Sequence, residues 1–250
     1  MAEDKQIGKI KVTVCQDKQE VARVAAEIFA KMIREKPDLM LGLATGGTPV
    51  DMYQMLIRMH KEQGLNFSRV RSFNLDEYVG LSGDHTQSYR YFMNANLFNH
   101  INIDKLNTHV PDGKAENFQM SCQQYEKDIQ AAAGIDLQLL GIGSNGHIAF
   151  NEPGSPGNSR TRVVTLTERT IKDNARFFQD ESEIPRQAVT MGIGTILEAN
   201  KIVLLATGAN KAEAVVKALK GKVTADLPAS FLQNHPDCIF ILDRDSAAGL

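Results

Sequence analysis

The most constraining feature of the sequence is a short apolar run that stops at a group of glycines. Residues 135–140 (IDLQLL) are followed directly by residues 141–152 (GIGSNGHIAFNE). An apolar run of this length, bounded by glycine, suits a buried central strand. Polar side chains after such a strand lie at its carboxyl end, where open α/β sheets bind ligands. The run therefore predicts a buried strand with a ligand site at its end.

Residues 141–152 also carry side chains that are suited to chemistry. Asn145, His147 and Glu152 supply an amide, an imidazole and a carboxylate in one segment, and glycines let the backbone approach a ligand closely. A glycine-rich turn with a merely exposed histidine would give the same pattern, so this segment alone leaves both interpretations open.

Other apolar runs repeat the order of strand and then helix. Expected strands lie at residues 9–16, 39–44, 70–75, 202–206 and 238–242, and apolar residues at helical spacing follow several of them. Neither an internal repeat nor a clear linker interrupts this order. We therefore predict one α/β domain over residues 1–250, with a doubly wound, Rossmann-like and mainly parallel sheet flanked by helices.

Two glycine turns at expected strand-to-helix junctions suit an anion. The first consists of Thr45, Gly46, Gly47 and Thr48, whose backbone N–H groups and hydroxyls can bind a phosphate at a helix N-terminus. The second places Lys211 near a helix start, which the helix dipole disfavours unless an anion balances the charge. Turns without a ligand are the alternative, and the first turn lacks the lysine of a Walker P-loop.

Two adjacent acids, Asp76 and Glu77, follow the expected strand at residues 70–75. Their carboxylates could hold a divalent cation, or one of them could act as a general base. Solvated loop acids are the third interpretation.

The segment from about residue 162 to residue 187 is mostly polar beyond its first residues and has no long apolar stripe. Little apolar surface would pin such a segment to the core, so we predict a mobile lid. An ordinary surface helix is the alternative.

The composition argues against several classes of protein. Hydrophobic residues make up 42% and charged residues 23%, with a net charge of −2, so neither disorder nor a nucleic-acid-binding surface is expected. No apolar stretch is long enough to span a membrane, and the N-terminus lacks an apolar signal core. Cys15, Cys122 and Cys238 form no CxxC pair, which favours reduced thiols and a cytoplasmic location.

Three motifs together resemble the glucosamine-6-phosphate deaminase family. They are residues 43–49 (LATGGTP), 73–81 (FNLDEYVGL) and 146–153 (GHIAFNEP), and residues 159–162, 174–178 and 208–212 continue the match in order. The resemblance implies conversion of glucosamine 6-phosphate and water to fructose 6-phosphate and ammonia, without a metal or other cofactor. It also implies a doubly wound fold shared with 6-phosphogluconolactonases and ribose-5-phosphate isomerases.

The resemblance assigns a role to each motif residue. Asp76 would move a proton between C2 and C1 of the opened sugar, and His147 would open the pyranose ring, with Asn145 and Glu152 orienting it. The assignment agrees with the chemistry, because a carboxylate suits the C2 proton and an imidazole can both accept and donate near neutral pH.

Phosphate binding is the second function that the resemblance assigns. Arg176 and Lys211 match the family's phosphate-binding cations, and the turn from Thr45 to Thr48 would supply neutral donors. On this match a metal at Asp76 and Glu77 is disfavoured, since no further ligands cluster at suitable spacing. The chain departs from many relatives at Asn145, where they carry Asp; an amide can orient His147 but cannot stabilise its charged form as a carboxylate would.

Two alternatives are kept beside the deaminase. A 6-phosphogluconolactonase or sugar-phosphate isomerase would have the same fold, but lactone hydrolysis has no use for a base at C2. A non-catalytic sugar-phosphate sensor would normally carry a DNA-binding helix-turn-helix. We expect none before Lys9 or after Asp243.

Regulation by N-acetylglucosamine 6-phosphate, which occurs in the hexameric branch of the family, is predicted to be absent here. Ser155 and Arg162 of that allosteric site remain, but Pro156 and Val164 replace a hydroxyl and a cation. We therefore expect a monomer or small homo-oligomer with hyperbolic kinetics. Initial rates with and without N-acetylglucosamine 6-phosphate should coincide. A sigmoidal curve that the effector makes hyperbolic would contradict the prediction.

Overall fold

The expected apolar runs form the strands of one large sheet. The computed structural model describes residues 2–168, 170–171 and 184–250. The strands of this sheet are β1 (Glu3–Ile7), β2 (Ile10–Cys15), β3 (Met40–Leu43), β4 (Arg71–Asn74), β6 (Thr108–His109), β7 (Leu137–Gly141), β10 (Lys201–Ala206) and β11 (Cys238–Asp243). Their order is β1-β2-β11-β10-β7-β3-β4-β6, and every pair except β1–β2 is parallel. The predicted doubly wound, mainly parallel sheet is confirmed.

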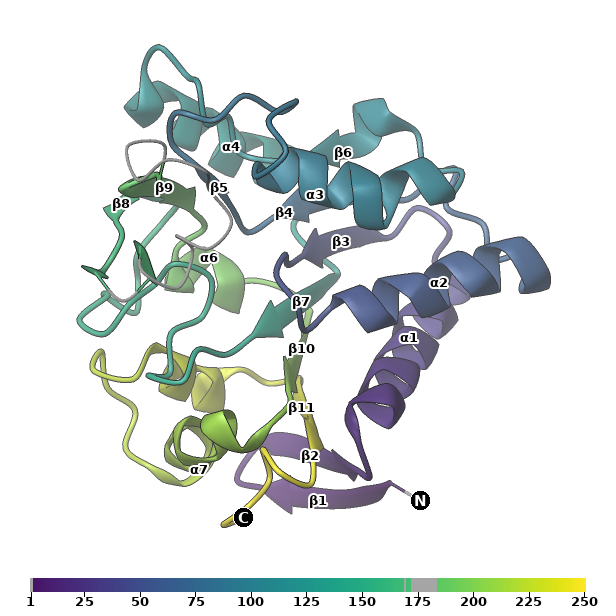
Figure 1. Cartoon of the computed structure of the whole chain (residues 1–250), viewed down its shortest axis with the longest axis vertical. Helices are drawn as coiled ribbons and strands as arrows, with labels where there is room; N and C mark the ends of the chain where they lie inside the picture. Colours follow the sequence, from purple (N-terminus) through teal and green to yellow (C-terminus); the bar gives the residue numbers. More distant parts are fainter. Residues whose placement is uncertain (1, 169, 172–183) are drawn as a thin grey trace.

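Helices cover both sides of this sheet. They are α1 (Lys18–Glu35), α2 (Val50–Gln63), α3 (Tyr89–Asn96), α4 (Phe118–Ala131), α6 (Ile193–Leu197) and α7 (Ala212–Lys220). Figure 1 shows α1 and α2 on one side, α6 and α7 on the other, and α3 and α4 near the end of the sheet that carries β4 and β6. The carboxyl ends of the central strands therefore lie between two layers of helices, where a ligand can reach them.

The helix starts follow from local sequence. Asp17 caps α1, because its carboxylate accepts the backbone N–H groups of Gln19 and Glu20, each at 2.9 Å. Ser88 caps α3 by accepting the N–H of Tyr91 at 3.0 Å. No side chain caps α2, which begins directly after the Thr45–Thr48 turn.

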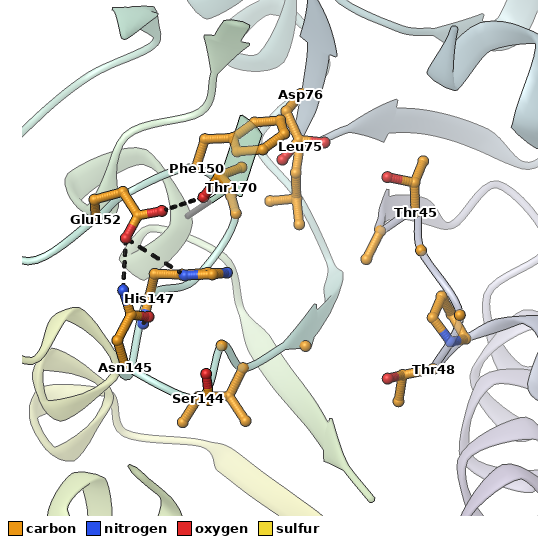
Figure 2. A pocket seen from close by; sticks show the side chains of 18 of the residues that line it. Thr45, Thr48, Leu75, Asp76, Ser144, Asn145, His147, Phe150, Glu152 and Thr170 are labelled. Atoms are coloured by element: carbon orange, nitrogen blue, oxygen red, sulfur yellow. Dashed lines mark hydrogen bonds and ion pairs between the residues drawn. The ribbon is translucent and has the colours of Figure 1, made fainter. Parts of the chain in front are cut away.

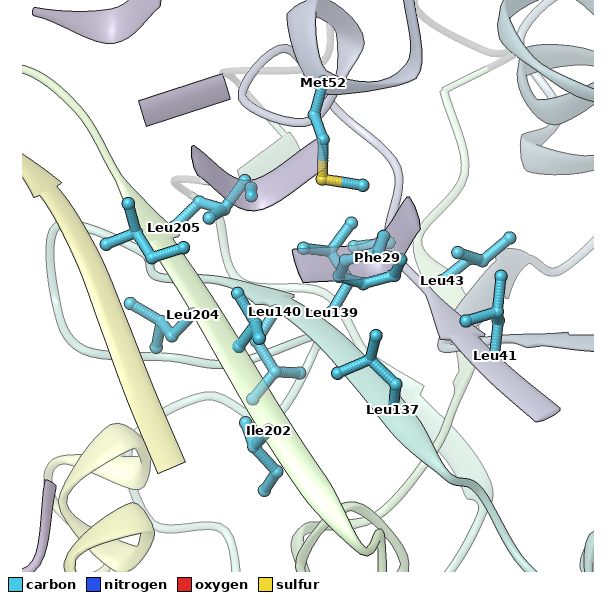
Figure 3. Packing of buried hydrophobic residues seen from close by; sticks show 14 of the residues in the cluster. Phe29, Leu41, Leu43, Met52, Leu137, Leu139, Leu140, Ile202, Leu204 and Leu205 are labelled. Atoms are coloured by element: carbon cyan, nitrogen blue, oxygen red, sulfur yellow. The ribbon is translucent and has the colours of Figure 1, made fainter. Parts of the chain in front are cut away.

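The hydrophobic core lies against the central strands. Figure 3 shows leucines of β3 and β7, including Leu41 and Leu137, packed near Phe29 of α1 and Met52 of α2. Each of these side chains is at most 2% exposed. Burial on both faces explains why the central strands are continuous apolar runs instead of alternating ones.

A second, smaller sheet differs from the sequence prediction. Asp76 and Glu77 were expected just beyond a strand, but they lie within β5 (Asp76–Tyr78). This strand pairs antiparallel with β9 (Gln187–Thr190), which also pairs with β8 (Arg162–Thr165). The interpretation as solvated loop acids is wrong, because both side chains are buried in this sheet.

The N-terminal strand β1 was not predicted. Its side chains are exposed or nearly so, because it pairs with β2 at the edge of the large sheet and packs little on the core. The predicted lid, residues 162–187, lies mostly outside the described residues. Its described ends include β8 and the first residue of β9, so a mobile lid stays a prediction for the part between them.

Gly42 is required by a polar side chain in the core. Gln138 lies beside Gly42 where β7 pairs with β3. A Cβ atom on Gly42 would lie only 2.0 Å from Oε1 of Gln138, whose side chain is fully buried. These two residues therefore determine how closely the two central strands approach.

Substitution Gly42→Ala should lower the free energy of unfolding by about 1–3 kcal/mol, because the added methyl overlaps a buried side chain. The loss in Gly42→Ala/Gln138→Ala should be smaller than the sum of the single losses, which urea unfolding in a double-mutant cycle will measure. Gly141→Ala is the control, since an added Cβ there meets no atom within 4 Å. Additive effects at residues 42 and 138 would contradict this packing.

Candidate active site

The strand ends of β3 and β7 open onto a cavity of about 250 Å³. These strands are neighbours in the sheet, but the chain continues from β3 towards β4 and from β7 towards β10. The cavity therefore lies at the point where the strand order reverses, which is where doubly wound proteins bind ligands. The predicted site residues among its lining are Thr45, Gly46, Gly47, Thr48, Asp76, Asn145, His147, Glu152 and Lys211. Arg176, the remaining one, lies outside the described residues.

The loop after β7 holds His147 in a tight turn. The N–H of Gly143 donates to the carbonyl of His147 at 2.9 Å, and Gly146 adopts a left-handed conformation with φ of 85°. A Cβ on Gly143 would lie 2.3 Å from Cε1 of His147. The imidazole therefore packs directly on the backbone of Gly143. The glycines of this segment were expected to allow close approach of a ligand, and Gly143 also allows close approach of the His147 ring.

Glu152 connects the polar groups of this loop. Nδ2 of Asn145 donates to Oε2 of Glu152 at 2.7 Å, and Nδ1 of His147 lies 3.6 Å from the same oxygen (Figure 2). Burial by itself would raise the pKa of Glu152, but His147, Asn145 and Thr170 outweigh it and lower the pKa to about 2. The Glu152 carboxylate is therefore charged at neutral pH and lies beside the imidazole.

Asp76 has the opposite environment. It is 6% exposed, and burial together with the negative charge of Glu77 raises its pKa to about 8. Figure 2 shows Asp76 near Leu75 and Phe150, apart from the Asn145, His147 and Glu152 group that lines the same cavity. Two carboxyls with pKa values pushed in opposite directions are suited to different roles in one reaction.

Glu77 does not point at a ligand but stabilises the start of α3. Its carboxylate accepts the backbone N–H groups of Tyr78, Tyr89 and Arg90, at 2.8, 2.9 and 2.9 Å. Burial raises its pKa, while these bonds oppose the rise. Glu77 thus fixes Tyr89, which lines the cavity, and also places a charge beside Asp76. Within the described residues, no cluster of three or more His, Cys, Asp or Glu side chains could hold a metal.

The first predicted anion-binding turn lines the cavity, and the second contributes Lys211 to it. In the first, Gly46 has φ of 93°, and α2 begins at Val50 with Pro49 as its N-cap. In the second, Gly208 has φ of 89°, and its N–H donates to both oxygens of Asp243, at 2.9 and 3.1 Å. Asp243 therefore fixes the turn that carries Lys211, a role that its distance in the sequence concealed.

The cavity is also lined by residues to which the sequence assigned no role in the site, among them Tyr89, Phe150 and Thr170. Thr170 lies within the predicted lid. Phe150 lies inside the central motif, but its apolar side chain carried no chemical signal. Their position depends on pairing between β5 and β9, which local sequence does not reveal.

The sheet order and the position of the cavity place this chain in the class of doubly wound α/β proteins with a ligand site at the strand switch point. Comparison with known proteins narrows the class. A model of the family glucosamine-6-phosphate isomerases/6-phosphogluconolactonase matches residues 16–240, so the chain belongs to this family.

Individual relatives agree with this assignment. A protein of Shewanella woodyi named glucosamine-6-phosphate deaminase is 56% identical over 96% of this chain and 91% of its own. The solved structure of a monomeric glucosamine-6-phosphate deaminase is similar with a TM-score of 0.92 and 47% identity, over 95% of this chain and 98% of that one. A 6-phosphogluconolactonase from Trypanosoma cruzi reaches a TM-score of 0.76 and 25% identity, over 98% of each chain.

The raised pKa of Asp76 predicts that the free energy of unfolding depends on pH. The folded chain keeps this carboxyl protonated up to about pH 8, whereas the unfolded chain releases the proton near the ordinary value of 3.8. The free energy of unfolding should therefore fall between these values as the pH rises. Asp76→Asn should match the parent near pH 4 and exceed its stability at pH 8 by on the order of a few kcal/mol.

Urea unfolding at both pH values will measure this difference. Asp84→Asn, which changes an exposed acid, is the control and should show no such trend. Equal stability of Asp76→Asn and the parent at pH 8 would mean that the carboxyl is not buried as described.

Proposed function

We propose that this chain is a glucosamine-6-phosphate deaminase, converting glucosamine 6-phosphate and water to fructose 6-phosphate and ammonia. The main support is that Asp76 and the pair His147 and Glu152 line one cavity together with the Thr45–Thr48 turn and Lys211. The names of its relatives at 52–56% identity agree with this activity.

The phosphate binds at the turn of Thr45, Gly46, Gly47 and Thr48. These four residues line the cavity near the start of α2, which no side chain caps and where the helix dipole favours an anion. Lys211 lines the same cavity and supplies a positive charge. Arg176, by family resemblance, contributes a second cation. Anchoring the phosphate places the sugar ring towards His147 and Asp76.

His147 opens the pyranose ring. It takes the proton of the C1 hydroxyl and delivers a proton to the ring oxygen, so that the C1–O5 bond breaks and an aldehyde forms at C1. The charged Glu152 stabilises the imidazole while it carries the extra proton, and Asn145 holds Glu152 in place.

Asp76 then transfers the proton from C2 to C1. Removing the C2 proton gives an enolamine, and returning a proton at C1 gives an imine at C2. Water adds to this imine and ammonia leaves, which yields fructose 6-phosphate. The base must be deprotonated, and the substrate's ammonium group next to Asp76 favours that form and opposes the rise in pKa that burial causes.

The substrate is thus a sugar phosphate, and the protein works as a cytoplasmic enzyme of amino-sugar catabolism. Its three cysteines are free and buried, in keeping with a reducing compartment. In the described part of the chain, no helix has both the length and the apolar character needed to cross a membrane. We further infer a monomer or small homo-oligomer, because the similar solved deaminase is monomeric.

An ammonia-release assay tests the function directly. The chain should form ammonia and fructose 6-phosphate in equal amounts, and unphosphorylated glucosamine should react at least about 100-fold less efficiently, since it lacks the charge-assisted bonds to the phosphate. Asp76→Asn should lower kcat by about 10²–10⁴-fold.

The Asp76→Asn variant also distinguishes a deaminase from a 6-phosphogluconolactonase. A lactonase would hydrolyse 6-phosphogluconolactone, would keep this activity in Asp76→Asn, and would release no ammonia from the amino sugar. This set of results would contradict the proposed function.

A further inference from the structure

The Glu152 carboxylate is held on both of its oxygens. Oε2 accepts from Asn145 at 2.7 Å and lies 3.6 Å from Nδ1 of His147. Oε1 accepts from the hydroxyl of Thr170 at 2.9 Å (Figure 2). The hydroxyl of Thr167 lies 3.5 Å from the same oxygen, at the limit of a hydrogen bond. Thr170 is the donor on the side away from the imidazole.

The direction of the hydrogen bonds at Thr170 follows from chemistry. A charged carboxylate can only accept, so the Thr170 hydroxyl must donate its hydrogen to Oε1. The bond of 2.9 Å between the two threonine hydroxyls is then donated by Thr167. Oγ1 of Thr167 in turn accepts the backbone N–H of Thr170 at 3.2 Å. The Thr170 hydroxyl is thereby fixed in the one orientation that serves Glu152.

This contact matters because the terminal torsion of a glutamate is soft. Rotation about it is broad and roughly two-fold, so a bond to one oxygen alone does not fix the carboxylate plane. His147 depends on that plane. Nδ1 of His147 is buried and makes no hydrogen bond within the described residues. Its polar neighbour is Oε2 of Glu152, at 3.6 Å. Small rotations of Glu152 would change the field at the imidazole.

We propose that Thr170 is a positioning residue for ring opening: its hydroxyl fixes the Glu152 carboxylate so that Oε2 remains directed at His147. The inference rests on the proposed function and adds a residue to it. The role is specific to one step, because Thr170 bonds to Glu152 and Thr167, whereas Asp76 lies on β5 and the Thr45–Thr48 turn follows β3.

Three variants test the proposal by ammonia release. Thr170→Val keeps the shape and removes the hydroxyl, and it should lower kcat/KM about tenfold, the scale of one hydrogen bond to a charged group. Thr170→Ser restores the hydroxyl and should return at least half of the activity. Thr165→Val makes the same exchange at an exposed residue of β8 and should behave as the parent.

Two further measurements identify the affected step. The open-chain analogue 2-amino-2-deoxyglucitol 6-phosphate has no ring to open, so its Kd should stay within twofold in Thr170→Val. With substrate deuterated at C2, the isotope effect on kcat/KM should be no larger than in the parent, because slower ring opening precedes cleavage of the C–H bond.

Other outcomes would overturn the proposal. Unchanged activity of Thr170→Val, a Thr170→Ser variant as impaired as Thr170→Val, weaker binding of the analogue, or a larger isotope effect would each do so. Absence of ammonia release by the parent chain would instead reject the proposed function, so the two failures are distinguishable.

Discussion

The cavity exists because β3 and β7 stop pairing early. Only Leu41 with Leu137 and Gly42 with Gln138 are in register, whereas β7 pairs with β10 over five residues. Beyond Gly42 the two strands separate, and the loops that follow them form opposite walls. The Gln138 side chain beside Gly42 occupies the last point of close approach. Asp76 is placed by the small sheet, whereas His147, Glu152 and the Thr45–Thr48 turn follow the ends of β7 and β3.

The two carboxyls in this cavity differ in pKa because they differ in hydrogen-bond donors and in neighbouring charge. Glu152 has donors on both oxygens, and its charged form is stabilised. Asp76 is as acidic in isolation, but it is desolvated and has a negative neighbour. The same functional group is therefore a permanent charge on one wall and has a pKa near neutral pH on the other. Glu77 contributes to this difference although its own oxygens are used by the backbone of α3.

The sequence predicted the features that depend on local pattern. Apolar runs and glycine turns identified the central strands, and the motifs around Asp76 and His147 identified residues that line one cavity. It did not predict β5, because residues 76–78 form a strand only through pairing with residues more than a hundred positions away. The contact between Asp243 and Gly208, which are 35 positions apart, was also missed. Both residues follow predicted strands, but local sequence does not reveal that these strands pair. The roles of the site residues remain predictions, and Arg176 lies outside the described residues.

The two borders of the large sheet have a consequence for behaviour at high concentration. At one border, β1 presents Glu3, Asp4 and Lys5, all exposed, and at the other, β6 has only two residues. Charged side chains on an edge strand oppose the approach of another copy, and a very short edge strand offers it little unpaired backbone. The sheet therefore resists growth into intermolecular β-structure, so copies can crowd together without sharing strands.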